Sequence, residues 1–396
     1  MRYRFADCVL DTQTLRLERH DEAVPVEPQV YDLLAVLVQN PTRVISKDEL
    51  IETVWQGRIV SDATISTRIN AARSAVGDDG TKQAIIRTIQ RRGIELRVPV
   101  EMETDKDKPK SVETAKPQRQ RIKYATSRDG TRIAYAQSGS GPPILRLSHH
   151  LSHLEMDWHS QLWRPLFDRL GAHNTLVRFD GRGTGLSDSN LEGAMIDDYV
   201  ADLSAVVDAA DIDNFPLITH LQSTPVALRF IADNPGRVSR LVVQEGYVRG
   251  RSLREGAQDS PDADPVIALM QTGWGDPNNG FMRGFASMIM PSASAEEINQ
   301  MIHLIASVAK PEDVVMARRI IDKFTAEDCL SKVDIPCLVI HARNDPIHPV
   351  EEARELAMGI PDSELLIVES SHTVCTPSDP TWEEQVSAMM DFLAET

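Results

Sequence analysis

The stretch Leu217–Arg229, LITHLQSTPVALR, contains a short apolar run, a polar turn and the start of a helix with apolar periodicity. That order predicts a strand that passes through a tight turn directly into a helix. Further strands are expected at 175–179 and 240–244, with a helix at 197–210. Alternation of strands and helices indicates a mostly parallel sheet covered on both faces. The sequence therefore predicts an α/β fold for this part of the chain.

Three motifs around this stretch carry a family resemblance. They are RFDGRGTGLSD at 178–188, LVIHARNDPIHP at 338–349 and SSHT at 370–373. With the first stretch they make residues 121–396 resemble an α/β-hydrolase, whose nucleophile stands on a G-x-S-x-G turn between a strand and a helix. The resemblance places Asp345 at the family's acid position and His372 at the position of its general base, so we expect Asp345 to hold His372. It places Leu221 where the family has its nucleophilic serine.

A leucine at the nucleophile position decides the expected chemistry. In acyl transfer the serine forms the covalent bond and the histidine only moves its proton, so a histidine without the serine has nothing to activate. We therefore predict that this domain is not an enzyme and that it binds a ligand. The alternative is an active esterase or lactonase with Ser223 as a displaced nucleophile. The Ser223 hydroxyl is expected to point into the helix or to cap its N-terminus, which argues against that alternative.

The expected pocket combines polar and apolar side chains. His149 and His150 lie on the loop after Leu147, from which hydrolases supply an oxyanion-hole amide. An insertion at about 247–330 resembles the family's helical cap and is rich in methionine and aromatic residues. Such side chains suit a small, largely apolar ligand. The residues expected to contact this ligand are His149, His150, Leu221, Gln222, Trp274, Phe281, Phe285 and His372.

The histidine-rich loop also suggests a metal site, because His153 and Glu155 follow His149 and His150 closely. Without a third, distant ligand, histidines close together on one loop are a weak signal. The four cysteines contain no C-x-x-C pair, which argues against a thiolate site. We therefore predict no metal and no cofactor.

The first hundred residues follow a different pattern. Alternating segments at 1–26 predict a small antiparallel sheet. Helices are expected at 28–39, after an N-cap at Ser46, and after an N-cap at Asp62 to about Val76. Residues 84–97 predict a β-hairpin that carries four arginines and one glutamate. A basic hairpin beside a polar helix face is typical of a phosphate-binding surface.

This order of elements resembles the winged-helix DNA-binding domain of OmpR/PhoB-type response regulators, also found in membrane-bound CadC and ToxR regulators. The matching segments are NPTRVISKDELIETVW, SDATISTRINAARSAVGDDG and IIRTIQRRG. The resemblance implies that the third helix enters the major groove and that the hairpin, or wing, contacts the minor groove or the backbone. One departure is Ile94, where the family's wing usually has an aromatic residue. The residues expected to contact double-stranded DNA are Thr64, Thr67, Arg68, Asn70, Arg73, Arg87, Arg91 and Arg92.

Composition suggests how the two domains are used. The net charge of −17 would repel DNA at long range, so DNA must be bound by the local basic surface. A polar segment at 102–120 predicts a flexible linker between a winged helix at 1–101 and the hydrolase-like domain.

Neither a signal peptide nor a long apolar run is apparent, which predicts a cytoplasmic protein with no membrane segment. A homodimer is expected because two half-sites multiply specificity. The sequence predicts a one-component transcriptional regulator that senses a small molecule.

Overall fold

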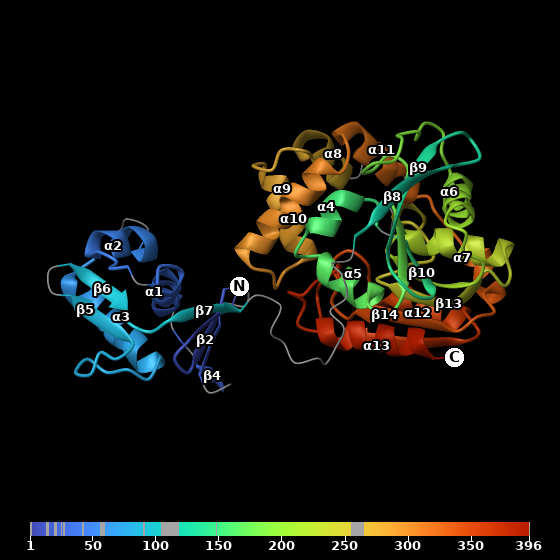
Figure 1. Ribbon diagram of the computed structural model, residues 1–396. Helices are drawn as coiled ribbons and strands as arrows, with labels where there is room; N and C mark the ends of the chain where they lie inside the picture. Colours follow the sequence, from blue (N-terminus) through green and yellow to red (C-terminus); the bar gives the residue numbers. More distant parts are fainter. Residues whose placement is uncertain are drawn as a thin grey trace. The chain divides into compact units, whose positions relative to one another are not determined.

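The computed structural model divides into two compact units, residues 1–114 and 115–396 (Figure 1). It describes residues 2–12, 16–19, 22–24, 26, 28–41, 43–55, 60–89, 92–103, 119–147, 149–254 and 265–395. The linker expected at 102–120 lies almost entirely outside these ranges. Each unit is therefore considered by itself.

The first unit begins with an antiparallel sheet, as its alternating sequence predicts. The sheet has the order β4-β3-β2-β1-β7. Its strands are β1 (Arg2–Phe5), β2 (Cys8–Asp11), β3 (Arg16–Arg19), β4 (Glu22–Val24) and β7 (Val100–Glu103). Because β7 pairs with β1, the sheet continues two residues past the boundary expected at 101.

Three helices and a hairpin complete the first unit. They are α1 (Pro28–Gln39), α2 (Lys47–Trp55), α3 (Asp62–Ala75), β5 (Ile86–Ile89) and β6 (Gly93–Leu96). The Ser46 hydroxyl accepts the Glu49 N–H at 3.1 Å, so Ser46 caps α2 as expected. Helix α3 is capped by Ser61, whose hydroxyl accepts the Thr64 N–H, and not by Asp62. The predicted cap was one residue too late because both side chains can accept this hydrogen bond.

The second unit is built on an eight-stranded sheet with the order β15-β14-β13-β12-β10-β11-β9-β8. Its strands are β8 (Arg121–Thr126), β9 (Arg132–Gly139), β10 (Pro143–Leu147), β11 (Thr175–Phe179), β12 (Phe215–His220), β13 (Val238–Gln244), β14 (Cys337–Ala342) and β15 (Ser363–Val368). Strand β9 runs antiparallel to both of its neighbours, and the strands from β11 to β15 are parallel. This confirms the mostly parallel α/β sheet.

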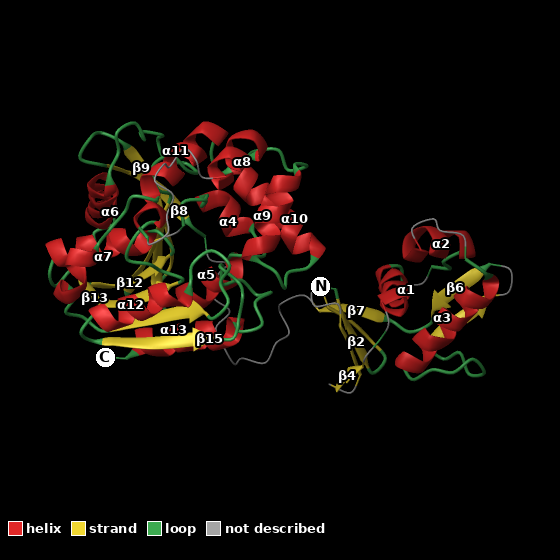
Figure 2. Ribbon diagram, turned by 180° about the vertical axis from the view of Figure 1, so that it is seen from behind, coloured by secondary structure: helices red, strands yellow, loops and turns green. Residues whose placement is uncertain are grey.

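Helices cover both faces of this sheet. They are α4 (Leu154–His159), α5 (Arg164–Gly171), α6 (Ile196–Ala209), α7 (Ser223–Asp233), α12 (Val350–Gly359) and α13 (Trp382–Ala394). Because successive strand residues point to opposite faces, Ile144 packs in the core of α5 and α13, while Leu145 packs in that of α6, α7 and α12. Figure 2 shows α13 running alongside the strand β15.

The insertion between β13 and β14 is helical, as the resemblance to a hydrolase cap implies. It contains α8 (Pro265–Gly273), α9 (Gly280–Ile289), α10 (Ala295–Ser307) and α11 (Pro311–Ile321), with short 3-10 turns at Arg251–Leu253 and Glu327–Lys332. The four helices lie together and share their apolar core with α5 and α13 (Figure 1). Among the described residues, no helix is both long and apolar enough to span a membrane.

Candidate functional site

Helix α3 has one buried and one exposed face, as its sequence predicts. Ile65 and Ala72 are buried, whereas Thr67 and Asn70 are exposed. Thr64 is half-buried and its hydroxyl lies 3.0 Å from that of Ser61. Arg68 is half-buried as well, and its Nε donates to the Gln29 side chain at 3.1 Å. The exposed polar face of α3 is therefore centred on Thr67 and Asn70.

Arg73 does not belong to the exposed face, contrary to the sequence prediction. Its side chain is buried, with its Nε donating to the Ile86 carbonyl at 3.0 Å. The other guanidinium nitrogens donate to Asn70 and to Thr88. Helical spacing alone had placed Arg73 outward, but the wing packs against this part of α3 and covers it. Arg73 therefore joins the helix to the wing and does not face DNA.

The wing presents its remaining described arginines to solvent. Arg87 and Arg92 are exposed, and Arg87 is 3.5 Å from Glu95 across the hairpin. Gly93 begins the return strand with a φ of +137°, and a Cβ there would lie 1.9 Å from the Ile45 carbonyl oxygen. The expected DNA contact Arg91 lies outside the described residues.

Asp78 holds the junction between α3 and the wing, and the sequence analysis missed it. Its carboxylate accepts four backbone N–H bonds, from Asp79, Ala84, Ile85 and Ile86. Burial would raise the pKa of Asp78, but these four donors outweigh burial and lower it. The signal in the sequence is the segment GDDG at 77–80, because an aspartate between glycines commonly accepts backbone N–H groups in a turn.

In the second unit, Leu221 stands at the apex of the turn between β12 and α7. Its backbone has a φ of 57°, in the left-handed region that residues other than glycine rarely adopt. The nucleophile of an α/β-hydrolase occupies the same sharp and strained strand-to-helix turn. The backbone here thus has the shape of the nucleophile turn, and its apex carries an apolar side chain.

The neighbouring hydroxyl groups at this turn are engaged in structural hydrogen bonds. The Ser223 hydroxyl donates to the His220 carbonyl at 2.9 Å and accepts the His220 N–H at 2.8 Å. The buried hydroxyls of Thr219 and Thr224 lie 3.0 Å apart. Ser223 therefore ties the turn to the strand and does not cap α7, contrary to the expectation that its hydroxyl would cap the helix or point into it.

Asp345 and His372 follow β14 and β15, but they do not hydrogen-bond to each other. The Nε2 of His372 accepts the backbone N–H of Ser292 at 3.1 Å. Asp345 accepts the N–H groups of Ile347 and His348 and the Thr373 hydroxyl. The expectation that Asp345 holds His372 is therefore wrong. His372 instead contacts the cap backbone, which sequence spacing could not reveal.

A cavity lies directly above Leu221, between the sheet and the cap. It encloses about 600 Å³ of empty space, part of it continuous with solvent. Five of the eight residues predicted to bind ligand line it: His149, His150, Leu221, Gln222 and Phe285. The cap side of the cavity comes from α9, α10 and α11. The structure therefore brings the two histidines and the altered nucleophile turn into one cavity.

His149 and His150, two of the three histidines that line this cavity, are neutral. The Nδ1 of His149 accepts the Leu151 N–H at 3.2 Å, which leaves its Nε2–H to donate elsewhere. Burial, followed by the charges of its neighbours, lowers the pKa of His149 well below its usual value. Burial and the charge of Arg318 lower the pKa of His150 to about 3. Both side chains therefore offer hydrogen bonds without a net charge.

Three predicted ligand contacts do not line this cavity. Trp274 and Phe281 form an aromatic cluster with Phe285, with Trp274 and Phe281 centroids 6.3 Å apart. Of these three rings only Phe285 reaches the cavity, because the others fill the interior of the cap. His372 is buried beside the cap and also does not line it. Lining residues missed by the sequence analysis include Trp163, Tyr247, Met301, Arg318, His348 and Thr373.

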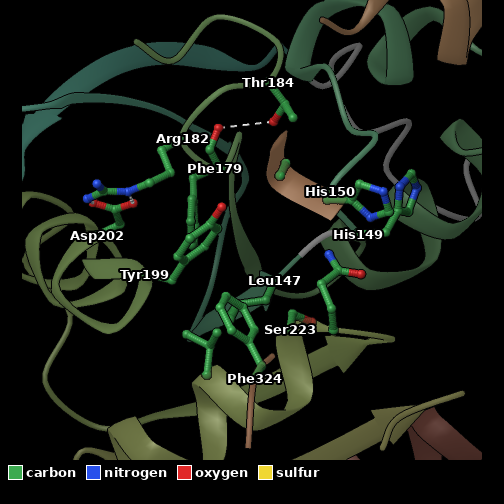
Figure 3. A pocket seen from close by; sticks show the side chains of 14 residues that line it. Leu147, His149, His150, Phe179, Arg182, Thr184, Tyr199, Asp202, Ser223 and Phe324 are labelled. Atoms are coloured by element: carbon green, nitrogen blue, oxygen red, sulfur yellow. Dashed lines mark hydrogen bonds and ion pairs between the residues drawn. The ribbon is translucent and has the colours of Figure 1, made fainter. Parts of the chain in front are cut away.

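A second cavity shares His149, His150 and Gln222 with the first. Apolar side chains from β10, β11, α6 and α7 form most of its wall, with Phe324 opposite the two histidines (Figure 3). At its far end Arg182 and Asp202 form a buried ion pair at 2.7 Å. The hydroxyl of Tyr199 is buried there without a hydrogen-bond partner. Its residues come from separate elements, and four of them, Phe179, Gly181, Arg182 and Thr184, lie in the motif RFDGRGTGLSD.

Comparison with known proteins agrees with the two units. Residues 21–96 match the family model described as transcriptional regulatory protein, C terminal. The chain is 34% identical to the transcriptional activator CadC of Escherichia coli K12 over 86 residues, which is 22% of this chain and 17% of CadC. The first unit is an OmpR/PhoB-type winged-helix domain. Because the chain spans under a fifth of CadC, the likeness concerns this DNA-binding domain alone.

The second unit is similar to hydrolases and their relatives. It is 26% identical to the non-heme chloroperoxidase CPO-A1 of Kitasatospora aureofaciens over 265 residues, which is 64% of this chain and 94% of that protein. The esterase from Exiguobacterium antarcticum superposes with a TM-score of 0.59 at 20% identity, covering 69% of this chain and 99% of the esterase. This likeness shows an α/β-hydrolase fold. The protein is therefore a DNA-binding transcriptional regulator domain fused to an α/β-hydrolase-fold domain.

Proposed function

We propose that this chain is a one-component transcriptional regulator whose hydrolase-fold domain is a receptor for a small, largely apolar molecule and not an enzyme. The observation that carries the proposal is Leu221, which stands at the apex of the nucleophile turn and lines the cavity. The turn keeps its backbone shape while its side chain cannot attack a carbonyl. The nearby hydroxyl of Ser223 is committed to the His220 backbone.

The cavity also suggests which chemical class of ligand it would hold. Its polar lining includes His149, which has an Nε2–H to offer, and Arg318 of the cap, whose guanidinium also pairs with Asp322 at 3.0 Å. Leu221, Met301 and Ile305 supply apolar surface. An apolar molecule with one carbonyl or carboxylate group would satisfy both parts.

Ligand binding would act on DNA through the cap and the oligomer. Helices α9, α10 and α11 each contribute residues to the cavity, so a ligand that fills it favours one cap position over others. A changed cap position would alter the arrangement of a homodimer and so the spacing of its two winged helices. The winged helix supplies contacts from α3 and from Arg87 and Arg92.

Mass spectrometry of the full-length protein purified from its own host tests the receptor proposal. We expect one small molecule to remain bound and to be released on denaturation. Phe285→Ala enlarges the cavity and removes apolar contacts, so the amount of this molecule that the protein retains should fall at least severalfold. Met288→Ala is the matched control, because Met288 is exposed on the same helix. Equal retention in both variants would place the molecule elsewhere.

Ester hydrolysis tests the competing function, an esterase or lactonase fused to a DNA-binding domain. We expect no turnover of p-nitrophenyl acetate by the wild-type protein, and none by Leu221→Ser, because His372 is bonded to the Ser292 N–H of the cap. Wild-type turnover that disappears in His372→Ala would overturn the receptor proposal.

A further inference from the structure

We propose that Glu245, His341 and Asp345 form a binding site for a divalent transition-metal ion such as Zn²⁺. The three residues lie at the carboxyl ends of β13 and β14, and one ligand atom from each lies within 4.8 Å of the others. The proposal departs from the sequence prediction of no metal. It does not depend on the cavity's having a ligand.

Unpartnered lone pairs converge at this point. The Oε2 of Glu245, the Nδ1 of His341 and the Oδ2 of Asp345 are buried atoms without a hydrogen-bond partner. The Glu245 side chain is 4% exposed and that of His341 is 0% exposed. Buried polar atoms almost always have a partner, so three acceptors that face one another must share either a proton or a metal cation.

Each candidate ligand is oriented through its other atom. His341 Nε2 lies 3.0 Å from the His348 carbonyl, which accepts its proton and so directs the Nδ1 lone pair toward Glu245. Glu245 Oε1 accepts the Ala342 N–H at 2.8 Å. Asp345 Oδ1 accepts the N–H groups of Ile347 and His348. Supporting bonds of this kind are what orient the ligands in protein metal sites.

The spacing and the donor types fit zinc. Two ligands of a tetrahedral Zn²⁺ at about 2.0–2.1 Å from the ion lie roughly 3.3 Å apart. The Oε2 of Glu245 and the Nδ1 of His341 are 3.3 Å apart. Asp345 lies on a loop and is only half-buried, so it can move the short remaining distance. One imidazole and two carboxylates form a set that suits zinc or manganese better than calcium or magnesium.

The ion would also stiffen one wall of the cavity. Ile347 and His348 both line it, and both are held through Asp345. The position that carries the acid in an active hydrolase would here anchor a metal-stabilised loop.

Metal analysis of the full-length protein tests the site. Protein stripped with a chelator is dialysed against ZnCl₂ or MnCl₂, desalted, and analysed by mass spectrometry for bound metal. We expect about one ion per chain in the wild type. Glu245→Gln and Asp345→Asn should each weaken binding at least tenfold. His303→Ala is the matched control, because this exposed cap histidine could bind zinc adventitiously.

A thermal melt keeps the result interpretable if a variant is poorly folded. Zn²⁺ should raise the melting temperature of the wild type and of His303→Ala, and should leave that of Asp345→Asn unchanged. Asp345→Asn preserves side-chain size and its Oδ1 acceptor, so we expect it to fold. A wild type that retains no ion, or variants that retain a full equivalent, would overturn the proposal and leave a shared proton as the bridge between the carboxylates.

Discussion

Two tight turns in this protein have positive φ for different reasons. In the wing, Gly93 lies against the backbone of Ile45, and a Cβ would meet the carbonyl oxygen at 1.9 Å. At the hydrolase turn, Leu221 has a φ of 57° and a side chain that reaches the cavity. The wing turn needs glycine because another chain segment passes too close. The hydrolase turn has room for a side chain, and a glycine would adopt its backbone with less strain.

The comparison indicates what each residue contributes. Gly93 is needed for the fold, because the side chain of any other residue there would collide with the backbone of Ile45. Leu221 adds nothing that the backbone needs, so its contribution must come from the side chain itself. That inference gives Leu221 a role in the cavity, and the following experiments test it from the largest expected effect to the smallest.

Gly93→Ala should cause the largest loss of stability. The added Cβ collides with Ile45 in a conformation unfavourable to alanine, so the free energy of unfolding should fall by about 3 kcal/mol or more. Denaturant unfolding of the full chain, followed by circular dichroism, measures this. Gly80→Ala is the control, because nothing lies within 4 Å of a Cβ there. Equal stability of the two variants would show that the wing turn does not require glycine at position 93.

Arg73→Ala should have the next largest effect on stability. It removes buried hydrogen bonds to the Ile86 carbonyl and the Thr88 hydroxyl, which costs about 2 kcal/mol. Arg87→Ala, at an exposed wing position, should change unfolding by less than about 0.5 kcal/mol. The same denaturant titration compares them. If Arg73→Ala lost DNA affinity without losing stability, Arg73 would be a DNA contact, as the sequence predicts.

Arg92→Ala should affect DNA binding and leave folding intact. Arg92 is exposed on the wing, so its loss should weaken binding to all sequences severalfold and lower the salt-dependence slope by about one. Fluorescence anisotropy with promoter DNA at several salt concentrations measures both. Arg128→Ala, an exposed arginine of the other unit, should change neither. An unchanged slope in Arg92→Ala would mean that the wing is wrongly assigned to DNA.

Leu221→Gly should leave stability within about 1 kcal/mol of the wild type, because relief of backbone strain offsets lost apolar contact. Asp211→Gly is the matched control: its φ is also 57°, and its exposed side chain loses no packing, so this variant should be slightly stabilised. Retention of the host molecule should fall in Leu221→Gly alone. A large destabilisation of Leu221→Gly would show that leucine serves the fold after all.

Neither His150 of the cavity nor His220 at the end of β12 should change its protonation over ordinary pH. Burial lowers the pKa of both His150 and His220 to about 3, so protonation requires acid well below pH 5. Side-chain NMR signals of these residues should therefore stay constant from pH 5 to pH 8. His150→Gln and His220→Gln assign the signals. A midpoint near pH 6.5 for either histidine would mean that water reaches that side chain freely.

Local patterns predicted much of the fold and part of the site. Strand β11 and the helices α1 and α3 follow from apolar periodicity and caps, which involve residues only a few positions apart. Leu221 could be placed at the turn because a strand and a helix flank it directly. Arg73 was misplaced because helical spacing says nothing of the wing that packs on it.

The sequence by itself determined the order of elements, the exposed wing arginines and the leucine at the nucleophile turn, because these depend on neighbours along the chain. Only the tertiary structure decided which side chains meet. His372 bonds a cap residue 80 positions away, and Glu245 meets His341 because β13 and β14 are adjacent in the sheet. Such contacts depend on which strands pair and where loops return, which no local pattern encodes.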